Sequence, residues 1–332
     1  MGDSPKVSIV ILNYNGLDFL KDCIASIRKQ TYKHIEIVVT DNNSSDGSLE
    51  FLRSTKDIVL VSHDDNYGYA RSNNDGAQAA TGDFLFFLNN DTVLYPDCIE
   101  KLVQNFEPRS LLSPVQVRPW KKGDEGYAHV GMDIFGYPYG KEDSRLNKPF
   151  YVDGAGIFIK KSDFFEIGQF DPELFIFQED IDLSWRAQMM GYHILTCWEA
   201  KFEHFGGGAV LGGVVKKKKY ETSYFRRFLN EKNVLRNILK NYSFPLNILI
   251  FSMIAFLHTG EILVLALLGK WKVINCYLKA YWWNITHLSN TLQFRKAVQE
   301  KRSIGDWELL KRMYWSYSKL IAFKNLGIPH FK

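Results

Sequence analysis

The first 91 residues alternate between stretches of nearly unbroken apolar residues and stretches with helical periodicity. Strands made mainly of Val, Ile, Leu and Phe and separated by helices are typical of a parallel sheet covered on both faces. The chain is therefore predicted to begin with an α/β fold that has a mostly parallel sheet. The predicted strands are 7–15, 35–41, 58–64 and 83–91, and the predicted helices are 19–30, 48–54 and 69–81.

Each of these strands ends in polar residues, at 13–15, 41–46, 64–68 and 89–91. In open α/β sheets, ligands bind outside the carboxyl ends of the strands. The sequence therefore predicts a ligand site at this edge of the sheet. Residues 110–170 are richer in Gly and aromatic residues, which indicates shorter, mixed strands and loops.

Three residues at these strand ends suit a nucleotide. Asp41 can accept a hydrogen bond from the imide N–H of uracil or thymine. Asp46 can contact a ribose or cap the short helix that follows, and both interpretations stay open. Gly68 precedes a helix, where the backbone can approach a phosphate closely, although turns use the same residue types.

Carboxylates later in the chain suit the chemistry of a diphosphate leaving group. Asp91 is a natural ligand for Mg²⁺ or Mn²⁺, with a turn or capping role as the alternative. Residues 178–186 place three carboxylates within four positions, which costs energy unless cations or function compensate. Asp182 and Arg186 are spaced for a structural ion pair on a helix. That pairing leaves Glu179 and Asp180, of which Asp180 is predicted to be a general base.

His204 comes directly before a glycine-rich segment that extends to residue 220. A lone histidine is usually structural, but its position beside a glycine hinge makes metal binding an equal alternative. The glycine-rich segment is predicted to be mobile and to close over the ligand, excluding water.

The charge of the chain is uneven. From Lys216 to the end there are 21 Lys and Arg against 6 Asp and Glu, whereas the preceding part has 20 against 31. A basic region of this kind suits an anionic partner. The four cysteines are widely spaced, as expected for buried thiols in a reducing compartment. The N-terminal stretch is too short and polar for a signal peptide, so the first part is expected to stay in the cytoplasm.

Residues 246–268 are 23 residues with one formal charge, Glu261. This length can cross a bilayer, but Asn247, His258 and Glu261 oppose a full span. We expect a membrane-embedded or interfacial helical segment or a kinked hairpin, with Trp and Lys nearby in the headgroup zone. A soluble helical bundle or a dimer interface is the alternative.

Six segments, taken in order, resemble glycosyltransferase family 2, and specifically its rhamnosyltransferase-like branch. The segments are VSIVILNYNG (7–16), DNNSSDGS (41–48), NYGYARSNN (66–74), GDFLFFLNNDT (82–92), VDGAGIFIKK (152–161) and GQFDPELFIFQEDIDLSWRAQMMGY (168–192). The resemblance implies a GT-A fold, which is a Rossmann-like sheet with an attached acceptor-side region. The implied catalytic domain is 1–220, with its nucleotide-sugar half at about 1–110 and its acceptor half at about 111–220. A basic, aromatic-rich, membrane-associated helical region follows at 221–332.

The resemblance also implies roles for individual residues. Asp91 would take the last position of a DxD-type metal motif, with Asn89 where the first Asp is usual, and His204 would lie on the metal side. Asp180 would be the catalytic base, next to Glu179. The donor-binding residues would be Asn13, Asn15, Asp41, Asn43, Asp46, Asn66, Gly68, Arg71 and Asn90. Asp153, Gly154, Ala155 and Gly156 would line the acceptor side.

The implied reaction is an inverting transfer from a dTDP- or UDP-linked sugar to a glycan or lipid-linked acceptor, with Mg²⁺ or Mn²⁺ on the diphosphate. Rhamnose is the leading sugar, with galactofuranose, glucose and N-acetylhexosamine as alternatives. A non-catalytic nucleotide-sugar-binding protein is the other class. The expected location is the cytoplasmic face of the cell membrane, with no nucleic-acid partner and with a homo-oligomer left open. A nucleotidyltransferase should have a Gly-rich, Arg/Lys-bearing loop after the first strand, where this chain has NYNGLDF (13–19).

Overall fold

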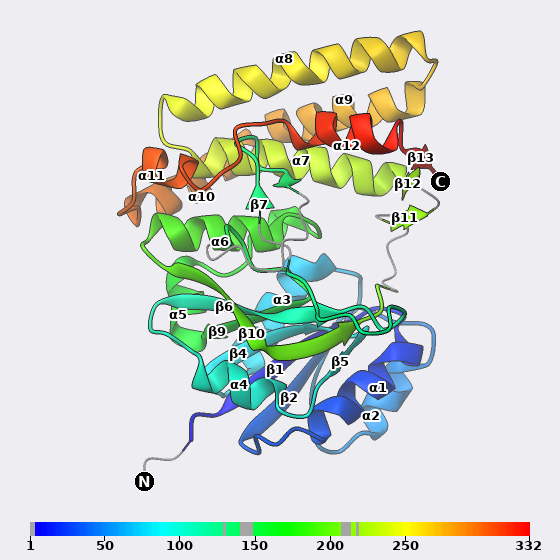
Figure 1. Cartoon of the computed structure of the whole chain (residues 1–332), viewed down its shortest axis with the longest axis vertical. Coiled ribbons are helices and arrows are strands. Elements are labelled where there is room, and N and C mark those ends of the chain that lie inside the picture. Colours follow the sequence, from blue (N-terminus) through cyan, green and yellow to red (C-terminus); the bar gives the residue numbers. More distant parts are fainter. Residues whose placement is uncertain (1–3, 129–130, 140–148, 207–213, 217–218) are drawn as a thin grey trace. The chain divides into compact units, whose positions relative to one another are not determined.

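The computed structural model describes residues 4–128, 131–139, 149–206, 214–216 and 219–332 (Figure 1). The chain divides into two compact units. The first contains residues 1–130, 141–187 and 191–209, and the second contains residues 131–140, 188–190 and 210–332. The division of the chain at residue 220 remains a prediction.

The first unit is an eight-stranded sheet with helices, in the strand order β3-β2-β1-β4-β9-β6-β10-β5. Its strands are β1 (Val7–Asn13), β2 (Ile35–Asp41), β3 (Val59–Ser62), β4 (Phe84–Asn89), β5 (Thr92–Leu94), β6 (Ser110–Val117), β9 (Gly156–Lys160) and β10 (His193–His204). Its helices are α1 (Leu17–Arg28), α2 (Ser48–Ser54), α3 (Gly68–Ala79), α4 (Cys98–Gln104), α5 (Lys161–Ile167), the short 3₁₀ helix η1 (Pro172–Leu174) and α6 (Glu179–Met189).

The parallel part of the sheet explains why its polar strand ends meet. β1 pairs in parallel with both β2 and β4, so that Asn13 lies opposite Asp41 and Leu12 lies opposite Asn89. β9 pairs antiparallel with β4 and β6, and β5 pairs antiparallel with β10. The mostly parallel sheet and the mixed strands of the middle region are therefore as predicted. All four cysteines are buried free thiols, also as predicted.

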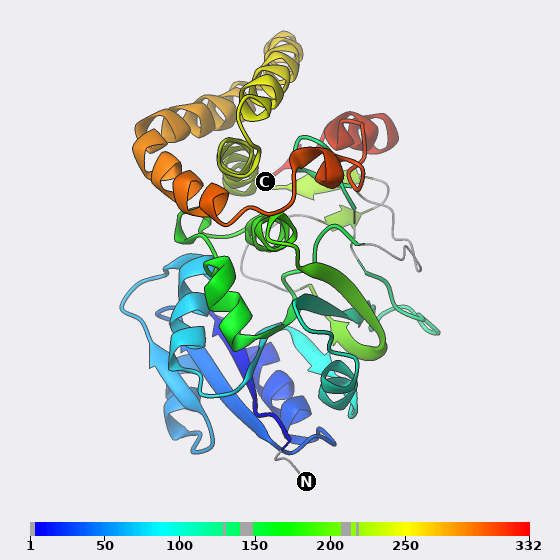
Figure 2. The same cartoon turned by 90° about the vertical axis from the view of Figure 1, so that its left-hand side faces the viewer.

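The second unit is mainly helical. Its helices are α7 (Tyr224–Asn241), α8 (Leu246–Leu267), α9 (Trp271–Thr286), α10 (Leu288–Glu300), α11 (Asp306–Leu310) and α12 (Ser318–Leu326). Short strands accompany them: β7 (Gly131–Met132), β8 (Pro138–Tyr139), β11 (Val214–Lys216), β12 (Lys219–Thr222) and β13 (His330–Phe331). Helices α8, α9 and α10 all pack against α7, which is largely buried (Figure 2).

Helix α8 runs without interruption through Gly260, so the expectation of a kinked hairpin within 246–268 is wrong. Gly260 is tolerated because a single helical glycine costs only about 1 kcal/mol. Among the described residues, α8 is the one helix that is long and apolar enough to cross a membrane by length and composition. Only 17% of its most apolar 18-residue window is buried within the protein, whereas the core helix of a soluble protein is mostly buried.

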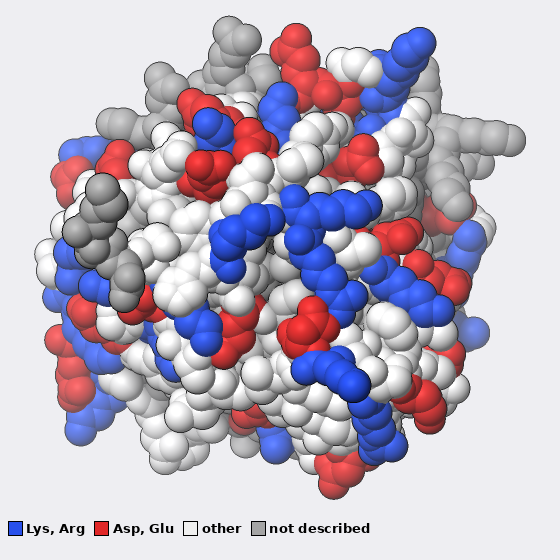
Figure 3. Space-filling model, turned by 90° about the horizontal axis from the view of Figure 1, so that it is seen from below, with Lys and Arg blue, Asp and Glu red and all other residues white. Residues whose placement is uncertain are grey.

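Acidic and basic side chains are interspersed on the face of the protein shown in Figure 3. A mixture of both signs produces no large single-sign field on that face.

Candidate functional site

A hydrogen-bonded group of side chains joins the ends of β1, β2 and β4. Asn13 donates to Oδ2 of Asp41 over 2.9 Å, and Asn90 donates to Oδ1 of Asn13 over 2.8 Å. The backbone N–H of Ser44 donates to Oδ1 of Asp41 over 2.9 Å. Asn13 and Asp41 are fully buried. The Asp41 carboxylate is therefore held in one orientation, and its oxygens keep lone pairs for a further donor.

Asp46 accepts hydrogen bonds at the start of α2, where Gly47 is the N-cap residue, and its contact with a ribose stays a prediction. Its Oδ1 accepts from the backbone and hydroxyl of Ser48 at the start of α2, and its Oδ2 accepts from the backbone N–H of Leu17. Burial, which raises the pKa of Asp46, is outweighed by these hydrogen bonds, so its pKa is lowered. Asn15 joins the same turn, because its Oδ1 accepts from the backbone of Ser45 over 2.8 Å.

The segment before α3 is held by its own polar side chains. Asn66 accepts from the backbone N–H of Gly68 over 3.0 Å, and Asn43 donates to the carbonyl of Asp64 over 3.1 Å. The exposed Arg71 guanidinium lies over the Tyr67 ring, 3.7 Å from its centroid. Asn43, Asn66 and Arg71 thus have structural contacts, and donor binding by them stays a prediction.

Gly68 is required by two features of the fold. Its φ is +77°, a conformation that favours glycine. A Cβ at this position would lie 2.5 Å from a ring carbon of Phe175 and 2.6 Å from its carbonyl oxygen. Phe175, Phe177 and Gln178 themselves have positive φ values of 64°, 71° and 70°. Such strained backbone persists only where the surrounding structure fixes it, and here it directly precedes α6.

Asp91 and His204 lie together, because β5 pairs with the end of β10 and places Thr92 opposite His204. Nε2 of His204 is 3.3 Å from Oδ1 of Asp91, and Nδ1 is 2.8 Å from Oε1 of Gln116. With Oε1 of Gln116 assigned to face the ring, Nδ1 carries the proton, because an amide oxygen only accepts. Nε2 and the carboxylate are then two acceptors in contact, which requires a proton or a cation between them.

This pair fits a divalent metal ion, since a hard carboxylate oxygen and an imidazole nitrogen are ligands that Mn²⁺ accepts. Gln116 would orient the His204 ring by accepting a hydrogen bond from its other nitrogen, as the partners of metal-bound histidines usually do. Burial lowers the pKa of His204, but the hydrogen bond and charge of Asp91 outweigh it, so the pKa is raised. Within the described residues, no group of three or more His, Cys, Asp or Glu is placed to hold a metal ion. Two protein ligands are therefore what the described chain offers.

Asp180 lies at the start of α6, against the turn that precedes β9. Its Oδ2 accepts from the backbone N–H of Gly154 over 3.1 Å, and Tyr69 donates its hydroxyl hydrogen to the carbonyl of Gly154 over 2.6 Å. Burial and the charge of Asp153 raise the pKa of Asp180 to about 7. A carboxyl group that titrates near neutral pH is suited to general base catalysis.

The remaining acceptor-side residues lie on the same turn. Asp153 accepts from the backbone N–H of Ala155 over 2.9 Å, and Gly156 packs closely on Pro114. Glu179 is buried beside Gly154. The charge of Asp153 contributes to the raised pKa of both Asp180 and His204, so this carboxylate acts on both parts of the candidate site.

The outcomes for the predicted ion pair and for the predicted mobile segment differ. Arg186 donates from Nε to Asp182 over 2.9 Å and both are buried, so the predicted structural pair is confirmed. The predicted mobile glycine-rich segment lies largely outside the described residues, at 207–213. Gln116 and Tyr69 were not predicted from the sequence. Gln116 had a signal, because it is a long polar residue near the end of a strand whose other polar residues are two serines and whose every position is buried.

Residues 8–165, just under half of the chain, match the family model described as glycosyl transferase family 2. A poly-β-1,6-N-acetyl-D-glucosamine synthase of Staphylococcus aureus (strain MSSA476) is 25% identical over 216 residues, which is 60% of this chain and 51% of that protein. A GalNAc(5)-diNAcBac-PP-undecaprenol β-1,3-glucosyltransferase of Campylobacter jejuni is 31% identical over 180 residues, which is 52% of this chain and 50% of that protein. The chain thus spans about half the length of these curated relatives.

Two solved structures have a similar fold. GalNAc-T7 with UDP, GalNAc and Mn²⁺ has a TM-score of 0.55 at 21% identity, over 72% of this chain and 48% of that one. The mannosyltransferase PcManGT from Pyrobaculum calidifontis, in complex with GDP-Man and Mn²⁺, has a TM-score of 0.51 at 16% identity, over 90% of this chain and 86% of that one. The fold of this chain is accordingly GT-A-like, with a C-terminal helical region. Because the matched residues 8–165 include the strands that carry Asn13 and Asp41 and the turn at Asp91, the N-terminal part of this chain belongs to glycosyltransferase family 2.

Proposed function

We propose that this chain is an inverting, metal-dependent glycosyltransferase that moves a sugar from a nucleotide diphosphate to a hydroxyl group of an acceptor. Two observations carry the proposal: the pairing of Asp91 with His204, and the carboxyl group of Asp180 in the same unit, whose pKa is about 7. The pair provides a place for a cation on a diphosphate, and Asp180 provides a base.

In the proposed reaction, Asp41 holds the base of the nucleotide and the Asn13–Asn90 pair borders the diphosphate. Asp180 takes the proton of the acceptor hydroxyl as its oxygen forms a bond to the anomeric carbon. The bond from that carbon to the phosphate oxygen breaks on the opposite face, and the nucleoside diphosphate leaves. A divalent ion held by Asp91 and His204 would neutralise the charge that develops on the diphosphate. One displacement of this kind inverts the configuration.

For the sugar, the relatives favour one of the alternatives over rhamnose. Their names describe synthesis of a poly-β-1,6-N-acetylglucosamine and glucose transfer to an undecaprenol-linked saccharide. Similar folds have been solved with UDP or with GDP-mannose, each with Mn²⁺. We therefore propose a UDP-linked glucose or N-acetylglucosamine as donor and a glycan or lipid-linked saccharide as acceptor, at the cytoplasmic face of a membrane contacted by α8.

A donor-hydrolysis screen in detergent tests this proposal. Purified full chain is given UDP-glucose, UDP-N-acetylglucosamine, GDP-mannose and dTDP-rhamnose, each with Mn²⁺, with Mg²⁺ and with chelator. We expect metal-dependent release of UDP from one UDP-sugar, and loss of release in Asp91→Asn. Binding of a donor without release in any condition, even with lipid extracts as acceptors, would favour the non-catalytic reading.

A further inference from the structure

Helix α8 has two faces of opposite character. Its exposed apolar residues are Ile248, Leu249, Met253, Phe256, Leu263, Val264 and Leu267. The other exposed positions of this helix are Ser252, Thr259 and Gly260, so its exposed face carries no charge. The opposite face, packed within the second unit, includes Asn247 and His258, and the half-buried Glu261 lies beside it.

Two of the three polar residues that counted against a full span, His258 and Glu261, have hydrogen-bond partners inside the protein, whereas Oδ1 of the buried Asn247 has none among the described residues. Nε2 of His258 is 3.0 Å from the hydroxyl of Tyr137, and Nδ1 is 3.0 Å from the hydroxyl of Tyr281. Glu261 forms an ion pair with Lys319 over 2.8 Å and accepts hydrogen bonds from Tyr277 and Tyr317. Their cost in an apolar surrounding is therefore offset within the unit, and the outward face is left free for hydrocarbon.

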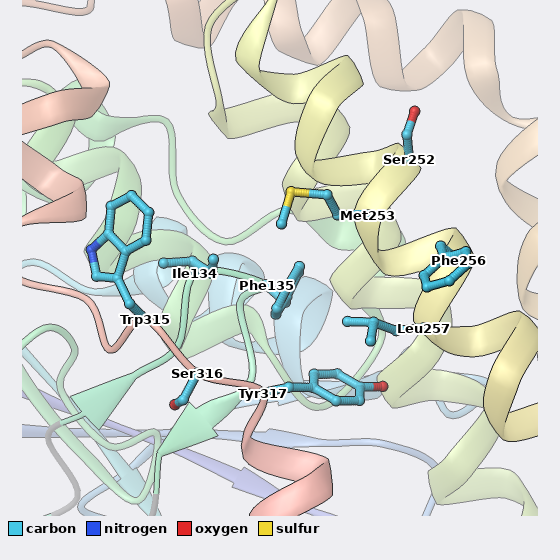
Figure 4. Close-up of a pocket in the computed structure, with 9 residues that line it drawn as sticks. All are labelled: Ile134, Phe135, Ser252, Met253, Phe256, Leu257, Trp315, Ser316 and Tyr317. Atoms are coloured by element: carbon cyan, nitrogen blue, oxygen red, sulfur yellow. The ribbon is translucent and has the colours of Figure 1, made fainter.

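A groove of about 580 Å³ opens along this helix. It is lined by Ile134, Phe135, Ser252, Met253, Phe256, Leu257, Trp315, Ser316 and Tyr317. Figure 4 shows Met253 and Leu257 projecting from α8 toward the side of the Ile134–Phe135 segment. No lining residue is charged, and the volume is within the range of roughly 300–1,000 Å³ typical of ligand sites.

The surroundings of the groove indicate which ligand it takes. The face of α8 is about 33 Å long at 1.5 Å per residue, close to the thickness of a bilayer's hydrocarbon core. Protein interfaces carry a polar rim and hydrogen bonds, whereas the exposed polar side chains of this face are Ser252 and Thr259. Trp271, Trp282 and Trp315 are each about two-thirds exposed, and Lys270 and Lys272 are exposed directly after α8. Tryptophan with lysine is typical of the zone of anionic headgroups.

We infer that this groove binds one acyl chain of an anionic bilayer phospholipid, whose headgroup lies among the exposed tryptophan and lysine side chains. The inference rests on the membrane contact in the proposed function and adds a specific lipid site to it. The bound chain fills a space between α8 and the segment at 315–317 that would otherwise expose apolar surface to water.

The test uses the full chain in phosphatidylglycerol vesicles doped with phosphatidylglycerol that carries a photoactivatable diazirine in one acyl chain. Peptide mapping after illumination locates the cross-links. We expect them at Ile134–Phe135, 252–257 and 315–317. Met253→Trp fills the groove, and we expect labelling there to fall at least about fivefold, which corresponds to roughly 1 kcal/mol of binding. Ser252→Trp is a second filling variant should Met253→Trp unfold.

Leu263→Trp is the matched control, because it adds the same ring to the exposed face of α8 outside the groove. It should leave the labelling pattern unchanged. Labelling spread evenly along α8, or equal in the filling and control variants, would overturn the inference. So would displacement of the label by polyprenyl phosphate but not by unlabelled phosphatidylglycerol, because the source of the chain would then be a lipid-linked substrate. Flotation with vesicles and binding of UDP-sugar, measured on the same proteins, report separately on membrane contact and on the proposed transferase activity.

Discussion

His204 faces Asp91 at 3.3 Å through Nε2, while its other ring nitrogen is held at 2.8 Å by the side-chain oxygen of Gln116. The arrangement fixes which nitrogen of His204 is available to a cation. It also means that the buried amide of Gln116, which touches no substrate group in our proposal, orients the histidine that would bind the metal ion.

Gln116→Leu should lower the affinity for Mn²⁺ without abolishing the reaction. Loss of the partner behind a metal-bound histidine typically costs about 10–100-fold in metal affinity. We expect the Mn²⁺ concentration for half-maximal activity to rise by that factor, with kcat largely recovered at saturating Mn²⁺. Gln116→Glu, which keeps an acceptor for Nδ1, should restore the affinity. An unchanged Mn²⁺ dependence in Gln116→Leu would remove His204 from the metal site.

Asp180→Asn should remove the general base. We expect kcat to fall by about 10²–10⁴-fold, the usual contribution of such a group, with little change in the KM for the donor. Asp163→Asn is the matched control, because burial also raises the pKa of Asp163 but this residue lies on α5. Near-normal turnover in Asp180→Asn would show that another group accepts the proton.

The same carboxyl predicts the pH dependence of activity. Asp180 must be ionised to act as a base, and its pKa is about 7. Activity should therefore rise with pH through about 7 and flatten above it, with a tenfold fall per unit on the acidic limb. A profile of kcat against pH at saturating metal and donor measures this. A limb centred near pH 4 would contradict the raised pKa.

The contribution of Asp180 to the free energy of unfolding should fall as the pH rises, whereas activity rises. The folded-state pKa of Asp180 is raised above its ordinary value of 3.8, so its protonated form favours the folded state. That contribution is complete below about pH 3.8 and is lost as the pH rises to about 7. Asp180→Asn keeps a neutral side chain, so its melting temperature relative to the natural chain should increase between pH 5 and pH 8. A constant difference over that interval would contradict the prediction.

Gly68→Ala should destabilise the first unit strongly. A left-handed φ costs a non-glycine residue about 1–2 kcal/mol, and a side chain forced against Phe175 adds about 1–3 kcal/mol. Gly123→Ala separates the two effects, because Gly123 has φ +73° but nothing within 4 Å of the added Cβ. Denaturant unfolding should show the larger loss at Gly68. Equal losses would mean that Phe175 moves aside without cost.

The strands in the N-terminal half of the sheet could be predicted from the sequence because they are short, apolar and bounded by turn residues. The predicted strand at 35–41 has the same bounds as β2, and the ion pair of Asp182 with Arg186 followed from spacing alone. β10 was missed. Its sequence, HILTCWEAKFEH, mixes charged and apolar residues, and its pairing with β6 shifts register between Cys197 and Lys201. A bulge disrupts the alternation on which strand prediction depends.

Side-chain direction was the other limit. Asn247, His258 and Glu261 counted against a full span of the bilayer, because a sequence shows which polar residues are present but not where they point. The partners of Glu261 come from α9 and from the segment leading into α12, so no local pattern could reveal them. Gln116 behind His204 is a similar case, since the two are 88 positions apart in the chain.

The ion pair of Glu261 also sets an order of events during synthesis. Tyr317, one of its partners, is 56 positions later in the chain, and Lys319 follows it. At about 5–20 residues per second, a ribosome adds that stretch in roughly 3–11 seconds. Throughout that interval Glu261 lacks its Lys319 partner, whereas Arg227 of α7, whose charge also interacts with Glu261, has already been made. The ion pair of Glu261 with Lys319 therefore forms only after the start of α12 has been synthesised, so the packing around α8 is completed late in folding.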